Sequence, residues 1–205
     1  MNGKFITIDG IEGAGKSTQI KLMTEFLRGA GKNVLITREP GGTDFGEKIR
    51  DILLDEKTGK LDARTELLMM FAARNEHIKQ KIQPALNSGL WVISDRFTDS
   101  SYAYQGGGRG LDFAKIRDLE KWTLGEFEPD LSLFLNISIK TSNKRLQHRG
   151  KKDRFEKENN DFFTKVYNGY QQRLAQNPDR IKNIDASGNI KSTFIKIQQH
   201  LNKIL

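Results

Sequence analysis

Short runs of buried-type residues alternate along the chain with longer segments whose apolar residues recur with helical periodicity. The short runs predict strands of a parallel sheet at Phe5–Asp9, Asn33–Thr37, Trp91–Asp95, Leu131–Asn136 and Ile181–Asp185. The longer segments predict helices at Ser17–Arg28, Phe45–Leu54, Arg64–Asn87, Phe113–Leu124, Thr141–His148, Phe162–Gln176 and Ile190–Ile204. Because strand and helix alternate, we expect an α/β fold with a five-stranded parallel sheet flanked by helices on both faces.

We expect one domain over residues 1–205, because this length is usual for a single domain and no segment resembles a linker. Two stretches are predicted to be loops. Gln105–Gly110 is rich in glycine, which loses backbone entropy in a regular element, and Gly150–Glu158 is a run of charges with little apolar anchorage. Ligands of such a sheet bind at the carboxyl ends of its strands.

Composition excludes several classes of protein. Hydrophobic residues make up 36% and charged residues 29% of the chain, and no apolar run approaches the roughly 20 residues of a membrane span. The first residues lack the pattern of a signal peptide, so we expect a cytoplasmic protein without membrane partners. The absence of cysteine excludes disulfides, thiolate nucleophiles and cysteine-ligated zinc, and the three histidines have no metal-ligand spacing.

The net charge of +8 is compatible with a nucleic-acid partner or with a small polyanionic substrate. The basic residues are spread along the chain, without a zinc-finger spacing, an aromatic RNA-binding pattern or a block of like charges. We therefore expect no nucleic-acid partner, and we interpret the charge as one that attracts nucleotide phosphates into a cleft.

The strongest single motif follows the first predicted strand and opens the first predicted helix. It fits the phosphate-binding pattern G-x-x-x-x-G-K-S/T through Gly10, Ile11, Glu12, Gly13, Ala14, Gly15, Lys16 and Ser17. In such a P-loop, glycines let backbone N–H groups surround phosphate oxygens at a helix N-terminus. Lys16 then contacts the β- and γ-phosphates of ATP and Ser17 binds Mg²⁺. The alternative is a glycine-rich turn without a ligand, but such a turn would not need the complete eight-residue pattern.

Two further strand ends carry candidate catalytic groups. Asp95 and Arg96 follow three buried-type residues, an arrangement that resembles a Walker B strand in which Asp95 holds Mg²⁺ and Arg96 binds a phosphate. The alternative is a surface ion pair at a strand end. Asp9 ends the first strand and is a candidate for Mg²⁺ or a sugar hydroxyl, although a strand-end Asp is also a good turn residue.

The motifs together resemble those of bacterial thymidylate kinase from about Lys4 to about Asp185. They are Asp9-Gly10, Gly15-Lys16-Ser17-Thr18, Thr37 to Thr43 (TREPGGT), Asp95-Arg96-Phe97, Ser100-Ser101, Ala103 to Gly106 (AYQG) and Pro129-Asp130-Leu131. The resemblance implies a P-loop NTPase three-layer sandwich with a short mobile lid at about residues 149–158, and adds Thr18 to the ATP-binding residues. It also implies a homodimer and, in dTTP biosynthesis, the reaction of ATP with dTMP to give ADP and dTDP with Mg²⁺.

The acceptor side agrees with this resemblance. Arg38 and Glu39 follow the second strand and face the cleft, and Arg50 lies on the next helix, where a cation can meet a phosphate. The resemblance implies that Arg38, Arg50 and Arg96 line the phosphate site of dTMP.

The base site is expected on the long helix and on the glycine-rich segment. Met70, Phe71 and Arg74 are spaced so that one helix face offers an apolar contact beside a guanidinium that reads a pyrimidine carbonyl. The family has its stacking Phe four residues before the arginine, where this chain has Met70, so either Met70 or Phe71 stacks on the base and the other belongs to the core. The family's base-and-sugar segment is matched by Ser101, Tyr104 and Gln105.

Positive charge is also needed beside the transferred phosphoryl group. The P-loop does not supply it from its variable positions, which contain the acidic Glu12 and no basic residue. The basic run from Arg149 to Arg154 can do so if it closes over ATP as a lid, and we expect Arg149 and Arg154 to be the catalytic arginines. The alternative is a solvated charged loop.

Other functions remain to be distinguished. A P-loop kinase could act on another monophosphate or on a deoxynucleoside, although three arginines at the acceptor side favour an acceptor that carries a phosphate. A nucleotide-dependent switch or a nucleic-acid-stimulated ATPase would use the P-loop differently. A GTPase needs the guanine-reading motif N-K-x-D, and the nearest string, at Asn143 to Leu146, lacks the acid. Dependence of ATP consumption on dTMP or on DNA would separate these functions.

Overall fold

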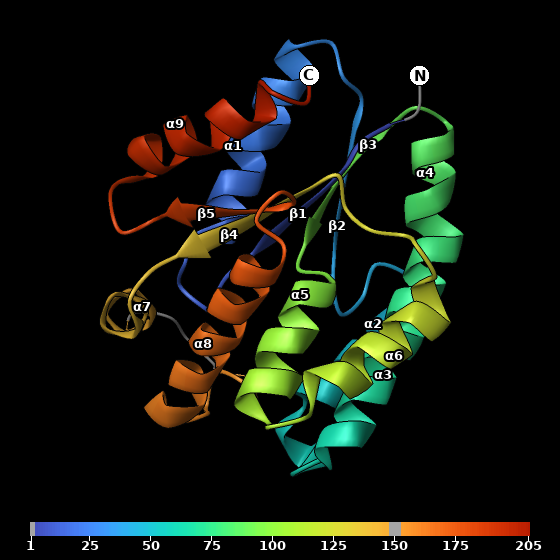
Figure 1. Cartoon of the computed structure of the whole chain (residues 1–205), viewed down its shortest axis with the longest axis vertical. Helices are drawn as coiled ribbons and strands as arrows, with labels where there is room; N and C mark the ends of the chain where they lie inside the picture. The colour runs from blue at the N-terminus through green and yellow to red at the C-terminus, as the bar shows by residue number, and fades with distance from the viewer. Residues whose placement is uncertain (1–2, 148–152) are drawn as a thin grey trace.

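A five-stranded parallel sheet in the order β2-β3-β1-β4-β5 forms the centre of the computed structural model, which describes residues 3–147 and 153–205 (Figure 1). The strands are β1 (Phe5–Asp9), β2 (Val34–Arg38), β3 (Trp91–Asp95), β4 (Leu131–Asn136) and β5 (Ile181–Asp185). The predicted fold class is confirmed, and only the second strand differs from its predicted bounds, by one residue. All five residues of β1 are buried, because this strand has neighbours on both sides and helices on both faces.

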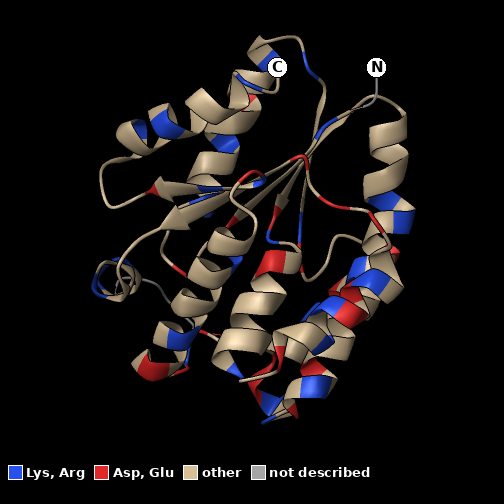
Figure 2. Cartoon of the chain, viewed as in Figure 1, with Lys and Arg blue, Asp and Glu red and all other residues tan. Residues whose placement is uncertain are grey.

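Helices cover both faces of the sheet. They are α1 (Lys16–Gly29), α2 (Asp44–Leu54), α3 (Ala63–His77), α4 (Gln83–Asn87), α5 (Thr98–Ser101), α6 (Phe113–Leu124), α7 (Ile139–Leu146), α8 (Asn160–Gln176) and α9 (Ile190–Leu201), with a 3-10 turn η1 (Glu56–Thr58). In Figure 1, α1 and α9 lie together on one face of the sheet, and α5 and α8 lie on the other. No helix in the described part of the chain is long and apolar enough to cross a membrane. Lys and Arg are interspersed with Asp and Glu on helices of both layers (Figure 2).

The long helix predicted over Arg64–Asn87 is interrupted. A π-helical segment, η2 (Ile78–Ile82), separates α3 from α4. Pro84 lies in the first turn of α4 and explains the interruption. Proline has no N–H to donate, and its ring displaces the carbonyl four residues earlier, so the preceding turn widens.

The loop predicted at Gln105–Gly110 is wrong for most of its length. Tyr102–Gly108 forms a second π-helical segment, η3, which packs against α8. A Cβ atom on Gly107 would lie 2.4 Å from the backbone oxygen of Lys165, and one on Gly108 would lie 2.5 Å from the ring of Phe162. These glycines therefore permit close contact between two helical segments, which offsets their cost in backbone entropy.

The charged stretch predicted as a loop at Gly150–Glu158 has turns in its described part, from residue 153 onward. Its expected lack of apolar anchorage is wrong, because the Phe155 side chain is 6% exposed and belongs to the main core. Phe155 also makes an edge contact with Tyr104 at a centroid distance of 5.9 Å. This aromatic contact anchors the segment beside the glycine-rich η3.

We predict that Gly107→Ala lowers the free energy of unfolding by about 2 kcal/mol, because the new methyl group overlaps the backbone of α8. Urea denaturation followed by circular dichroism measures this change. The matched control is Gly29→Ala, since Gly29 ends α1 and a methyl group added there would meet no atom within 4 Å. The control should be neutral or slightly stabilising. Equal stability of the two variants would contradict the close-packing role of Gly107.

Candidate active site

A cleft of about 470 Å³ lies at the carboxyl ends of the central strands and connects the P-loop with the predicted acceptor side. Most of the predicted site residues line it. They are Glu12, Gly13, Gly15, Lys16, Ser17, Thr18, Arg38, Glu39, Arg50, Met70, Arg74, Asp95, Arg96, Ser101, Tyr104 and Gln105. The residues predicted for the donor and those predicted for the acceptor therefore share one cavity.

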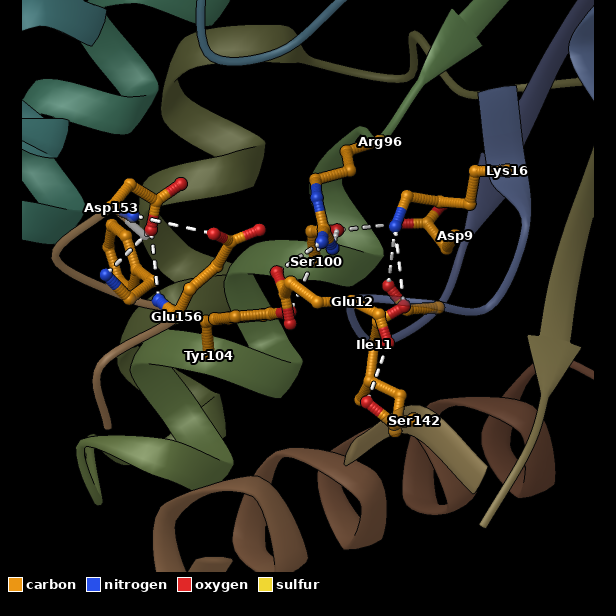
Figure 3. A network of polar contacts seen from close by, with 12 residues as sticks. Asp9, Ile11, Glu12, Lys16, Arg96, Ser100, Tyr104, Ser142, Asp153 and Glu156 are labelled. Atoms are coloured by element: carbon orange, nitrogen blue, oxygen red, sulfur yellow. Dashed lines mark hydrogen bonds and ion pairs between the residues drawn. The ribbon is translucent and has the colours of Figure 1, made fainter. Parts of the chain in front are cut away.

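The P-loop has a backbone conformation that needs glycine. Gly15, immediately before α1, has φ of 93°, in the left-handed region that favours glycine, and leaves the N-terminus of α1 open to the cleft. The Lys16 ammonium donates to the carbonyl oxygens of Gly10, at 3.0 Å, and Ile11, at 3.4 Å (Figure 3). Ile11 and Ala14 are buried at the back of the loop, so only their backbone can serve a ligand. Burial, and then the nearby Arg96 guanidinium, lower the pKa of Lys16.

Helix α7 supports the P-loop from the other side. The Ser142 hydroxyl donates to the carbonyl oxygen of Glu12 at 2.7 Å, and Arg145 donates to the carbonyl oxygens of Gly13, at 3.1 Å, and Ala186, at 3.0 Å. Arg145 also lines the cleft, although the sequence analysis did not select it. No motif marks this arginine among the other basic residues of α7, because its contacts are to backbone carbonyls far away in the sequence.

Arg96 lines the cleft beside the P-loop. Its guanidinium donates to Glu12 of the P-loop at 2.7 Å and to the hydroxyls of Tyr104, at 3.2 Å, and Tyr170, at 3.1 Å (Figure 3). Its φ of 71° is in the left-handed region, which is strained for a residue with a long side chain. Burial raises the pKa of both tyrosine hydroxyls, so each keeps its proton. Tyr170 was missed from the sequence because it lies on α8, far along the chain.

Two aspartates end adjacent strands beside the P-loop. Asp9 accepts a hydrogen bond of 2.5 Å from the Ser100 hydroxyl, but its Oδ2 and the Oδ1 of Asp95 are buried and have no hydrogen-bond partner among the described residues. Burial, and then the charge of Asp99, raise the pKa of Asp9 to about 6. Unpaired carboxylate oxygens in such a place are the ligands that a hard cation such as Mg²⁺ prefers.

Arginines gather on the acceptor side of the cleft. Arg38 donates to Glu47 at 2.7 Å, and Arg50 donates to the carbonyl oxygen of Pro40 at 2.9 Å. Burial, and then the positive charge of Arg38, lower the pKa of Arg50. Cations held this close together favour an anion between them.

Arg74 is buried in a dense network below the acceptor side. Its Nε donates to Glu39 at 2.7 Å, and its remaining nitrogens donate to the Ser101 hydroxyl and the Phe97 carbonyl, each at 3.1 Å. The other oxygen of Glu39 is 3.0 Å from Nδ1 of His77, a residue that the sequence analysis did not select. This network fixes the guanidinium at the wall of the cleft.

The structure separates the two candidates for the base-stacking contact. Met70 is half-buried and lines the cleft, whereas Phe71 is 1% exposed and belongs to a core cluster. The ring of Phe71 lies 4.7 Å from the Arg74 guanidinium carbon, so Phe71 supports the arginine from behind.

Of the two arginines predicted for the lid, Arg149 lies outside the described residues. Arg154 is described, and its guanidinium donates to Glu66 and to the carbonyl oxygen of Leu53, each at 2.7 Å. Its neighbours Asp153, Phe155 and Glu156 line the cleft. In this conformation Arg154 is therefore paired with Glu66 of α3 and with the end of α2.

Comparison with known proteins identifies the family of this arrangement. The family model for thymidylate kinase matches residues 8–197. The chain is 55% identical over 196 residues to thymidylate kinase of Ruthia magnifica subsp. Calyptogena magnifica, a match that covers 96% of each protein. It is 50% identical over 204 residues to thymidylate kinase of Nitrosospira multiformis, which covers 100% of this chain and 99% of the relative.

A solved structure agrees with the sequence matches. The crystal structure of thymidylate kinase from Ehrlichia chaffeensis superposes with a TM-score of 0.79 at 32% identity, over 98% of this chain and 99% of the other. The P-loop, the arginines of the acceptor side and the shared cleft fit this similarity. The chain thus belongs to the thymidylate kinase family and phosphorylates dTMP to dTDP in nucleotide biosynthesis.

Proposed function

We propose that the chain transfers the γ-phosphoryl group of Mg²⁺-bound ATP directly to a phosphate oxygen of dTMP, within the cleft between the P-loop and the arginine cluster. The position of Arg96 is the observation that carries this proposal. One nitrogen of its guanidinium, Nη2, donates both to Glu12 of the P-loop and to the hydroxyl of Tyr104, and that hydroxyl itself donates to Glu12 at 2.8 Å. A cation in that place can contact both reacting phosphates.

The reaction needs charge neutralisation and alignment. An ionised oxygen of the dTMP phosphate attacks the γ-phosphorus, a new P–O bond forms, and the bond to the β-phosphate oxygen breaks, so that ADP leaves with the electron pair. No general base is required because the attacking oxygen carries no proton at neutral pH. Lys16 and the N–H groups at the start of α1 bind the transferred phosphoryl, while Arg96 orients the attacking phosphate.

The residues present fit a bound Mg²⁺. Among the described residues no cluster of three or more acidic, His or Cys side chains could hold a metal by itself. Asp9 and Asp95 each have an unpaired buried oxygen, and Ser17 follows Lys16 in the P-loop. This set suits an ion that takes its other ligands from ATP and water. When bound, Mg²⁺ neutralises charge on the β- and γ-phosphates.

Most of the predicted acceptor residues keep their roles in this proposal, but Phe71 belongs to the core and Glu39 is assigned no direct contact with dTMP. We assign Arg38 and Arg50 to the dTMP phosphate, Arg74 to a carbonyl oxygen of thymine, and Met70 to the face of the base. Gln105 then reads the base edge. Glu39 acts through Arg74, because their ion pair is buried.

Three further predictions remain proposals. Arg149 and Arg154 supply charge from the lid, and for Arg154 this requires release from Glu66. A homodimer is inferred from the family resemblance, and the Trp122 side chain on α6, which is 83% exposed, is a candidate for its interface. The cytoplasm is the proposed location.

We predict that ADP release depends on dTMP and on Mg²⁺. A coupled assay with ATP against dTMP, dUMP, dCMP, dGMP, AMP and thymidine should show strong preference for dTMP, and chelation of the metal should abolish turnover. Lys16→Met should lower kcat by at least about 100-fold without changing the circular dichroism spectrum. Phosphorylation of thymidine, or ADP release without an acceptor, would contradict the proposal.

We predict that Arg50→Met raises the KM for dTMP by about tenfold or more and leaves the KM for ATP within about twofold. Thymidine, which lacks the phosphate, should bind both enzymes equally as an inhibitor. Arg64→Met is the matched control, since the Arg64 side chain is 81% exposed on α3. A parallel loss of thymidine affinity would show that Arg50 does not act on the phosphate.

We predict that Asp9→Asn stabilises the nucleotide-free protein at pH 7 and lowers kcat. Because the pKa of Asp9 is raised from 3.8 to about 6 in the folded state, the wild-type protein loses stability as the pH rises between these values. The loss is about 2 to 3 kcal/mol above pH 6. Urea denaturation should therefore show a gain of about 2 kcal/mol at pH 7 that disappears near pH 4. Asp118→Asn, at an exposed site, is the control. A gain independent of pH would contradict this account.

A further inference from the structure

Glu66 is a fully buried carboxylate behind the proposed base site. It lies in the first turn of α3 and its side chain is 0% exposed. Its Oε1 accepts a hydrogen bond of 2.8 Å from Nε2 of Gln105, and its Oε2 accepts one of 2.7 Å from Arg154. Arg109 contacts both oxygens at 3.4 and 3.5 Å.

The contact with Glu66 determines which end of the Gln105 amide faces the cleft. A carboxylate paired with guanidinium groups can only accept hydrogen bonds, whereas an amide has an NH₂ end that donates and an oxygen that accepts. The NH₂ group must therefore face Glu66. The amide oxygen is left as the end that can face a ligand, because Gln105 lines the cleft.

We propose that Glu66 is a positioning residue that holds Gln105 as a hydrogen-bond acceptor and thereby selects pyrimidines that carry a proton on N3. Thymine and uracil have an N3–H that donates to such an oxygen, whereas N3 of cytosine is an acceptor and is left unpaired against it. This inference rests on the proposed base site, in which Gln105 reads the base edge. An unpaired polar contact in a buried site is a strong source of discrimination.

Two arginines make the buried charge of Glu66 tolerable. Burying an isolated carboxylate inside a protein costs free energy. Arg109 and Arg154 offset this cost, because both form ion pairs with Glu66. The ring of Phe155 lies 4.8 Å from the guanidinium carbon of Arg154 and 5.6 Å from that of Arg109. Arg109 also forms an ion pair with Glu158 at 2.5 Å. The segment around Phe155 thus secures the carboxylate that orients Gln105.

The test replaces the carboxylate by an amide of the same shape. In Glu66→Gln, residue 66 can donate as well as accept, so the Gln105 amide is free to turn over. We expect the ratio of kcat/KM for dTMP to that for dCMP to fall by about tenfold, since Arg74 still disfavours the cytosine amino group. The ratio of dTMP to dUMP should stay within about twofold, because both bases carry the same N3–H. An unchanged ratio of dTMP to dCMP would overturn the inference.

Two further variants distinguish the proposed role of Glu66 from the proposed base site on which it rests. Gln105→Leu removes the proposed base contact, so it should lower the preference for dTMP over dCMP as well. If Gln105→Leu lowers the preference and Glu66→Gln does not, the base site stands and the role of Glu66 falls. If Gln105→Leu has no effect, the base site itself is wrong. Glu66→Asp keeps an acceptor-only group and should keep most of the selectivity, so a loss equal to that of Glu66→Gln would assign Glu66 a packing role.

Loss of folding in Glu66→Gln would not prevent the test. The double variant Glu66→Gln with Arg154→Gln removes one uncompensated guanidinium together with the carboxylate. Titration calorimetry with dTMP, dUMP and dCMP then measures selectivity without turnover. Arg154→Gln alone is its control and should keep the preference for dTMP over dCMP. Equal preferences in the single Arg154 variant and the double variant would overturn the inference.

Discussion

The parallel pairing of β1 with β3 is the constraint on which the active site depends. Their register places Ile8 opposite Asp95, and the Arg96 N–H donates to the Ile8 carbonyl at 3.0 Å just beyond the last pair. Asp9 and Arg96 are therefore brought to the same edge of the sheet, beside the P-loop that continues β1. A slip of one residue would turn every side chain of β3 to the other face and separate these groups.

The active site also depends on the pairing of its buried charges. The site partly or fully buries several ions, and most of them are placed against an opposite charge: Arg96 against Glu12, Arg74 against Glu39, and Arg154 against Glu66. Removal of one partner from such a pair leaves a buried charge that costs several kcal/mol. The unpaired oxygens of Asp9 and Asp95 are departures from this rule. They lie beside the P-loop, where β1 and β3 end.

Two features that lower the stability of the fold lie close together beside the P-loop. Arg96 has a left-handed backbone conformation, and burial holds the Asp9 carboxylate at a raised pKa. Both features oppose folding at neutral pH, and both belong to residues beside the P-loop. Such costs persist where the surrounding structure enforces them. The well-packed strands around them provide this support, since β1 and most of β3 are buried.

Features that are encoded locally could be predicted from the amino-acid chain alone. The P-loop pattern, the strands and the groups that end them could be read from short segments, because each is encoded by neighbouring residues. The parallel arrangement of the strands then places these end groups at one edge of the sheet. The choice between Met70 and Phe71 needed the packing of α3, since adjacent helix positions face different directions and only one of them meets the cleft. The helical conformation of Gly107 and Gly108 also depends on tertiary packing, because both lie in close contact with α8. The contacts of Glu66 join three segments distant in sequence, so no local pattern could reveal them.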